Sequence, residues 1–130
     1  MKTYYGMLFL MIYALISCSP KVYSTNGETI YKTGRNINGE KLLNRKASSI
    51  KIISSCKTCH GSNGDAMRRL SIKFRDLSNP QNLSTPYNDA LFYRFLDEDL
   101  KSNGNKANIG VIWKMSNSDK KDLLDYLKQL

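Results

Sequence analysis

The chain of 130 residues has one histidine, His60, and three cysteines, which limits the metal sites it can build. A structural zinc site holds its metal through about four nitrogen or sulfur ligands. Cys56, Cys59 and His60 stand together, but Cys18 lies in an apolar N-terminal region that has another explanation, so a zinc site lacks a ligand. No strand or βαβ pattern surrounds Cys56 and Cys59, and a disulfide between them would be strained. The sequence therefore disfavours a zinc site, a thioredoxin-type redox pair and a disulfide.

Acidic side chains are also few. The chain has 11 Asp and Glu against 20 Lys and Arg, with a formal net charge of +9. A basic protein can bind nucleic acid, but no known nucleic-acid-binding module is visible. The excess charge is better suited to steering the protein onto an acidic partner protein or a membrane surface. A solvated, lysine-rich surface explains it about equally well.

The long apolar run at residues 4–16 is too short for a comfortable membrane span. Lys2 before it supplies the positive charge of an export signal. Residues 15–18, Leu-Ile-Ser-Cys, resemble a bacterial lipobox, which implies a lipoprotein signal peptide at residues 1–17 and lipidation of the Cys18 thiol. An ordinary cleaved signal and an uncleaved anchor are the alternatives. We therefore expect an exported protein of the periplasm or cell envelope, anchored to a membrane through lipid on Cys18.

The pentapeptide Cys56-Lys57-Thr58-Cys59-His60 is the most specific feature of the sequence. Two cysteines separated by two residues and followed at once by a histidine form the attachment pattern of a c-type haem. Each thiol can add across one haem vinyl group, and His60 is then the proximal ligand of the iron. One covalent haem would also supply apolar surface that so small a domain lacks. We therefore expect the protein without haem to be poorly folded.

The chain shows no internal repeat or low-complexity segment, so we expect a tether at residues 18–25 and one domain at residues 26–130. Thr25 and Glu28 have the spacing of a capping box and predict the start of a short helix. Gly34 is expected to end that helix.

Two amphipathic helices are predicted in the second half of the chain. One begins after Asn88, presents the acidic residues 97–99 to water and is closed by residues 102–104. The other begins near residues 116–118. Their apolar stripes are expected to wall the haem pocket, through Leu91, Phe92, Phe95, Leu96 and Leu100 of the first helix and Leu123, Leu124, Tyr126, Leu127 and Leu130 of the second.

Three further stretches are less regular. The short apolar run at residues 50–53 does not distinguish a brief extended segment from the first turn of the haem-bearing helix. The glycine-rich residues 61–65 are expected to end that helix and to let backbone pass close to a flat ring. Residues 70–86 are predicted to form an irregular loop that packs against the haem edge.

Together these features resemble class I cytochrome c over residues 26–130. The resemblance rests on Cys56-x-x-Cys59-His60-Gly61 with Gly64 and Asp65, on Trp113-x-x-Ser116, and on Asp122-Leu123-Leu124-x-Tyr126-Leu127-x-x-Leu130. It implies an all-α fold in which a few short helices, joined by long irregular loops, wrap around the covalent haem c. It also implies that the first and last helices cross, with Gly27 against Tyr126.

Two positions depart from the pattern of that family. Gly110, Val111 and Ile112 precede Trp113 where similar sequences carry Met-Pro, so the usual sixth iron ligand is not in its usual place. Arg75 stands before Asp-Leu where similar sequences often carry Pro. This second change leaves open which carbonyl accepts the other ring N–H of His60, a bond that normally orients an iron-bound imidazole.

The sixth iron ligand is therefore not assigned by a motif. His60 is the only histidine, so a second histidine of the same chain is excluded. Met115 is the candidate we favour, although ordinary core packing explains this residue about equally well. Met67 follows the haem motif too closely to reach the other haem face easily. The remaining candidates are Lys106, Lys114, Asn108, a tyrosine and water.

The resemblance implies an electron-transfer protein rather than an enzyme, either a membrane-tethered one-electron carrier or the electron-entry subunit of a larger redox enzyme. Its partners are expected to be redox proteins with an acidic docking surface, and basic residues such as Lys57 would lie near the exposed haem edge. The alternative is a haem protein that binds or senses small ligands, which an open or weakly filled sixth position would favour.

Overall fold

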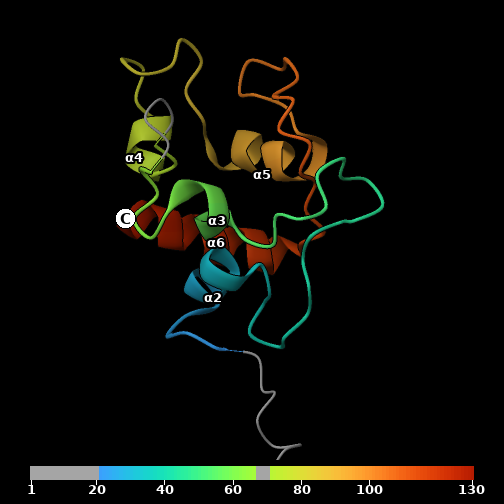
Figure 1. Cartoon of the computed structure of the whole chain (residues 1–130). Coiled ribbons are helices and arrows are strands. Elements are labelled where there is room, and N and C mark those ends of the chain that lie inside the picture. Colours follow the sequence, from blue (N-terminus) through green and yellow to red (C-terminus); the bar gives the residue numbers. More distant parts are fainter. Residues whose placement is uncertain (1–20, 67–70) are drawn as a thin grey trace, which may run out of the picture.

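The computed structural model describes residues 21–66 and 71–130. These residues form five helices, α2 (Asn26–Thr33), α3 (Cys56–His60), α4 (Phe74–Leu77), α5 (Asp89–Glu98) and α6 (Asn117–Gln129), and their β structure is limited to isolated bridges (Figure 1). The predicted all-α class is therefore confirmed for this part of the chain. The predicted signal peptide at residues 1–17, the lipidation residue Cys18 and the candidate ligand Met67 lie outside the described residues.

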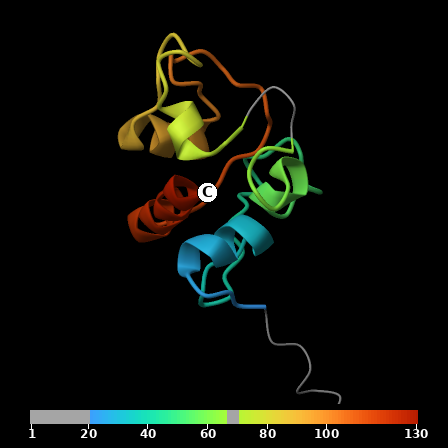
Figure 2. The same ribbon diagram turned by 90° about the vertical axis from the view of Figure 1, so that its left-hand side faces the viewer.

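Helix α6 runs through the middle of the molecule, with α2 on one side and α4 and α5 on the other (Figure 1, Figure 2). Helices as short as these are marginal on their own, so burial of apolar side chains between them supplies most of their stability. The core consists of Ile30, Tyr31, Leu42, Leu77, Phe92, Leu96, Val111, Trp113, Leu123, Leu124 and Leu127. None of the described helices has the length and apolar character needed to cross a membrane.

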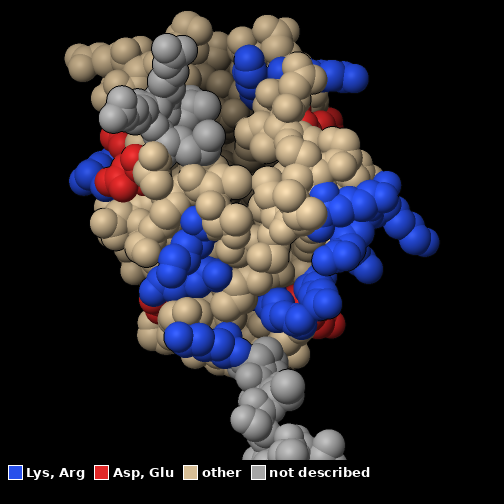
Figure 3. All heavy atoms as spheres, viewed as in Figure 1, with Lys and Arg blue, Asp and Glu red and all other residues tan. Residues whose placement is uncertain are grey.

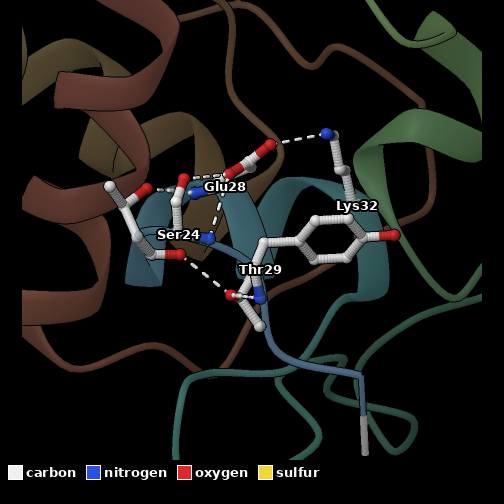
Figure 4. Close-up of polar contacts among 6 residues, drawn as sticks. Ser24, Glu28, Thr29 and Lys32 are labelled. Atoms are coloured by element: carbon white, nitrogen blue, oxygen red, sulfur yellow. Dashed lines mark hydrogen bonds and ion pairs between the residues drawn. The ribbon is translucent and has the colours of Figure 1, made fainter.

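Helix α2 begins and ends where the sequence predicts. The Thr25 hydroxyl accepts a hydrogen bond from the Glu28 amide at 3.1 Å, and Gly34 ends the helix with a φ of 66°. The Glu28 carboxylate does not complete the predicted capping box. It accepts hydrogen bonds from Ser24 and forms an ion pair with Lys32 one turn later, as Figure 4 shows. A lysine four residues after a glutamate is a favourable partner on a helix, so the carboxylate has two partners away from the Thr25 amide.

Helices α2 and α6 cross at Gly27, where the resemblance places this contact. A Cβ atom built at Gly27 would overlap the Asp122 carbonyl oxygen and lie 2.9 Å from Tyr126 Cβ. Only glycine lets the two backbones approach this closely. The neighbouring Asn26 strengthens the crossing, because its Nδ2 donates to the Asp119 and Asp122 carboxylates at 3.1 and 2.8 Å.

Helix α6 begins with a complete capping box. The Ser116 hydroxyl accepts from the Asp119 amide, and the Asp119 carboxylate accepts from the Ser116 amide. Lys120 in the first turn forms an ion pair with Asp97 of α5, with 2.5 Å between nitrogen and oxygen. The start of α6 is therefore held locally by its cap and laterally by α5.

Helix α5 starts at its predicted cap, Asn88, but ends at Glu98, before the predicted closing residues 102–104. Asp99 ends it in the left-handed conformation, with a φ of 54°. The prediction that Asp99 faces water is wrong. Its side chain is half-buried and accepts hydrogen bonds from the amides of Ile109 and Gly110 at 3.3 and 2.9 Å. One carboxylate thus attaches a distant loop to the end of α5, which no local pattern indicates.

The structure also shows what the described residues of the less regular stretches form. Residues 50–53 form neither a strand nor a helical turn, and α3 starts only at Cys56. Within the predicted loop at residues 70–86 the chain forms α4, which was not expected from the sequence. Leu77 of α4 is buried, and Phe74 packs edge-on against Phe92 of α5 with ring centroids 6.4 Å apart. Four residues carry too little periodicity to predict a helix, so tertiary packing decides this one.

Candidate cofactor site

A cavity of about 630 Å³ lies between α3, α5 and α6. Its volume falls within the range of about 300 to 1,000 Å³ that is usual for cofactor and ligand sites. The lining is mostly apolar, and Lys101 is the only Lys, Arg, Asp or Glu among the described residues that line it. A hollow is visible in the upper half of the face drawn in Figure 3. The cavity therefore suits a largely apolar group with few charges.

The three residues of the predicted haem motif lie on one wall of this cavity, which Cys56, Cys59 and His60 all line. The single turn of α3 brings them together, and Gly61 ends this turn with a φ of 70°. A Cβ atom at Gly61 would lie 2.7 Å from Ala66 Cβ, so glycine allows the chain to turn back directly behind His60. The glycine predicted to end this helix does so.

The His60 ring has an unpaired polar atom at this wall. Its Nδ1 atom is buried and has no hydrogen-bond partner among the described residues. A buried polar atom without a partner is rare and calls for an explanation, such as a missing bound group. Burial also lowers the pKa of the His60 imidazole, which favours the neutral form that binds metals. The carbonyl acceptor left open in the sequence analysis is not found among these residues.

The two cysteines of the motif are both free thiols in this structure. Burial raises the pKa of the Cys56 thiol to about 12, because a thiolate would lose its hydration there. A thiol that keeps its proton is not activated for redox exchange. Within residues 21–66 and 71–130, no group of three or more His, Cys, Asp or Glu side chains is placed to hold a metal ion.

Tyr31 of α2 holds the turn that follows His60. Its side chain is fully buried, and its hydroxyl donates to the Gly61 carbonyl oxygen at 2.6 Å. The ring packs against Tyr126 of α6, with centroids 5.3 Å apart. Burial raises the pKa of Tyr31 to about 12, so the hydroxyl keeps its proton and remains a donor. The crossing of α2 and α6 is thereby connected to the turn directly after His60.

Among the described residues, few candidates for a sixth iron ligand line the cavity that holds the Cys56-x-x-Cys59-His60 motif. Met115 packs, partly buried, against the core and is not among the described residues that line the cavity. Lys106 and Asn108 line a separate, open hollow, and Lys114 lines neither space. Tyr87 is a tyrosine that does line the cavity.

Two loops beside α5 contribute to the lining. Residues 83–85 before α5 belong to the loop that was expected to pack against the haem edge, whereas residues 101–103 after α5 were not expected at the site. The Ser102 hydroxyl donates to the Thr85 carbonyl oxygen at 2.5 Å, which holds the two loops together. Residues 102–104 were expected only to close α5, and no pattern in the segment at residues 101–103 indicates that it faces a cavity.

Comparisons of the chain with family models, with curated proteins and with solved structures each gave no match. What bears on function is therefore the motif, the cavity that it lines and the contacts that hold it.

Proposed function

We propose that this chain is a monohaem c-type cytochrome that transfers single electrons, either as a carrier or as the electron-entry subunit of a larger redox enzyme. The observation that carries the proposal is the position of Cys56, Cys59 and His60 on one wall of an apolar cavity of about 630 Å³. Burial of the His60 ring supports it, because burial lowers the pKa of the imidazole and so favours the neutral form that binds metals.

The class I cytochrome c fold is part of this proposal. The close approach of α2 and α6 at Gly27 supports it, because the resemblance implies that the first and last helices cross there. Trp113, which belongs to the motif before the last helix, lines the cavity and supports it as well.

Each group at the site has a distinct task in this function. Cys56 and Cys59 would hold the haem through thioether bonds, and His60 would bind its iron. The haem, when bound, supplies a one-electron iron couple. Apolar side chains from α5 and α6 exclude water from the site, while Lys101 offers a charge to the propionates. Electron transfer makes no bond to substrate, so we assign no catalytic residue.

The test is expression with export and c-type haem maturation, followed by intact mass and a reduced-minus-oxidised spectrum. We expect one added haem and the absorption bands of a c-type cytochrome. A Cys56→Ala, Cys59→Ala double variant should lose the covalent haem, whereas Ser54→Ala, at an exposed neighbouring position, should keep it. A colourless mature protein with the mass of bare polypeptide plus lipid would refute the proposal.

A haem protein that binds small ligands is the second candidate function. The position of Met115 favours it, because a methionine that packs in the core leaves the sixth position without the expected thioether. Carbon monoxide added to the reduced protein should then change the spectrum rapidly. No change would indicate a filled sixth position and electron transfer alone.

The ligand assignment is tested by Met115→Leu, which nearly conserves side-chain volume. If Met115 only packs, the ferric spectrum will be unchanged. Loss of a weak long-wavelength band typical of methionine bound to iron would restore Met115 as the ligand.

Export and lipidation complete the proposed function. The lipobox-like residues 15–18 support cleavage before Cys18 and attachment of lipid to its thiol. The mature protein should stay with membranes washed at high salt, whereas Cys18→Ser, exported behind a cleavable signal without a lipobox, should be washed off. Equal distribution of both proteins would contradict a lipid anchor on Cys18.

A further inference from the structure

Basic charge is concentrated in the first half of the described chain. Residues 21–64 carry eight Lys and Arg against two Asp and Glu, whereas residues 71–130 carry nine against eight. No acidic residue occurs in residues 41–64, and the five basic side chains there are all exposed: Lys41, Arg45, Lys46, Lys51 and Lys57. In Figure 3 basic side chains gather at the right edge, where Figure 1 shows the blue-green loop.

Large apolar side chains are exposed in the same region. Ile52 is 91% exposed, and Ile50 and Ile109 are 37% and 39% exposed. The Ile50 amide donates to the Gly110 carbonyl oxygen at 3.0 Å, which brings the loop of Ile109 beside Ile50. We call this surface the loop patch, which consists of Arg45, Lys46, Ile50, Lys51, Ile52 and Ile109.

We propose that the loop patch binds a lipid bilayer with anionic headgroups. Isoleucine side chains can enter the boundary between headgroups and acyl chains, while adjacent basic side chains pair with phosphate. A protein partner fits less well, because lysine is depleted in the centre of protein interfaces and Lys51 lies between two exposed isoleucines.

Acidic side chains near the patch oppose this binding only weakly. Glu98 and Asp99 line the hollow that Ser49 and Gly110 also line. The Asp99 carboxylate is half-buried and already accepts two backbone amides, so Glu98 is the exposed carboxylate of that hollow. The balance of charge on this face therefore stays positive.

Docking would determine how the cavity is oriented relative to the membrane. The proposed lipid on Cys18 precedes the domain by residues 18–25, which span at most about 29 Å when extended. A basic patch is a common second membrane signal beside a lipid anchor. Ile109 of the loop patch lines the cavity, and so does Ile53, which directly follows Ile52 of the patch. The loop patch therefore lies at the rim of the cavity. The orientation of a haem rests on the proposed function, but binding of the patch to lipid does not.

The experiment uses the exported, mature chain carrying Cys18→Ser and released from a cleavable signal without a lipobox, so that only the protein surface can bind lipid. Sedimentation is measured with vesicles of phosphatidylcholine alone and with vesicles that also contain phosphatidylglycerol. We expect binding only to the anionic vesicles, with an affinity that falls as salt is raised. Absence of binding at low salt would refute the proposal.

Two double variants with the same change in net charge locate the binding surface. Lys46→Gln with Lys51→Gln should reduce affinity for anionic vesicles by about tenfold or more. Lys121→Gln with Lys128→Gln, both on α6, should change it less than twofold. Equal losses in the two variants would show that only net charge matters and would overturn the loop patch. Ile52→Ser should also weaken binding, and unchanged binding would exclude insertion.

Haem absorbance, recorded on the same samples, separates this proposal from the proposed function. A haem-loaded protein that does not bind anionic vesicles would refute only the proposal that the loop patch binds lipid. A colourless protein that binds them through the loop patch refutes only the cytochrome.

Discussion

At the scale of single residues, the Tyr31 hydroxyl connects the helix crossing to the turn behind His60. Tyr31→Phe keeps the ring but removes the donor from the Gly61 carbonyl oxygen. A carbonyl left without its partner costs about 1 to 3 kcal/mol. We expect the free energy of unfolding of the haem-loaded protein, measured with urea, to fall by that amount.

Tyr126→Phe is the matched control, because Tyr126 belongs to the same aromatic pair and is only partly buried. Its effect should stay within about 0.5 kcal/mol, as for most substitutions away from buried networks. Equal losses in the two variants would mean that the Tyr31 hydrogen bond does not stabilise the motif.

Gly27 gives a second prediction at this scale, in which a glycine-to-alanine substitution lowers the stability of a helix rather than raising it. Replacing a helical glycine with alanine normally stabilises a helix by about 0.5 to 1 kcal/mol. Here the added Cβ atom would overlap the Asp122 carbonyl oxygen. We expect Gly27→Ala to destabilise the protein by about 1 to 3 kcal/mol, measured by thermal unfolding. A stabilised variant would show that α2 and α6 are not in close contact.

At the scale of elements, the ion pair of Lys73 and Asp65 joins the turn after α3 to the segment before α4. The distance between nitrogen and oxygen is 2.8 Å, and the ammonium group holds the pKa of Asp65 below its ordinary value. A carboxylate whose folded pKa is lower than its unfolded pKa contributes its full stability above the unfolded pKa. That contribution is lost as the pH falls through the folded pKa.

Lys73→Gln should therefore raise the pKa of Asp65 towards its ordinary value, measured by an NMR titration of the carboxyl group. Lys128→Gln, which removes a charge from α6 instead, should leave the Asp65 titration unchanged. An unaltered pKa in Lys73→Gln would show that the ion pair does not persist in solution.

The cap of α6 is the other element-scale prediction. Ser116→Ala removes the hydroxyl that accepts from the Asp119 amide. Loss of such a cap costs about 0.5 to 2 kcal/mol of the free energy of unfolding, measured with urea. Ser118→Ala, at an exposed position inside the helix, should have almost no effect. Similar losses in both variants would argue against the cap.

At the scale of the whole molecule, a cavity of about 630 Å³ lies between α3, α5 and α6 of a small domain. Without a bound group, the side chains that wall it lose their contacts on one side. We expect the Cys56→Ala, Cys59→Ala protein to lose near-ultraviolet circular dichroism while keeping part of its far-ultraviolet signal. A haem-free variant that unfolds as cooperatively as the haem-loaded protein would show that the haem is not part of the core.

Much of this structure could be predicted because the interactions that decide it are short-range. Thr25 and Gly34 bound α2, Asn88 caps α5 and Ser116 caps α6, each through backbone groups a few residues away. The haem motif is contiguous as well, so one helical turn places its three residues on the same wall.

Other features depend on residues far apart in the chain. Three features fall in this class: helix α4, the hydrogen bonds that the Asp99 carboxylate accepts from the amides of residues 109–110, and the packing of Met115 away from the cavity. A sequence pattern records which side chains are apolar or polar, but not which distant backbone group each will meet.

By itself the sequence determined the all-α class, the caps of the longer helices and the grouping of Cys56, Cys59 and His60, because each follows from neighbours within about one helical turn. Only the tertiary structure decided that Tyr31 reaches Gly61, that Met115 joins the core and that the loop patch forms at the cavity rim. These depend on how the helices pack, and packing depends on the fit of the whole core.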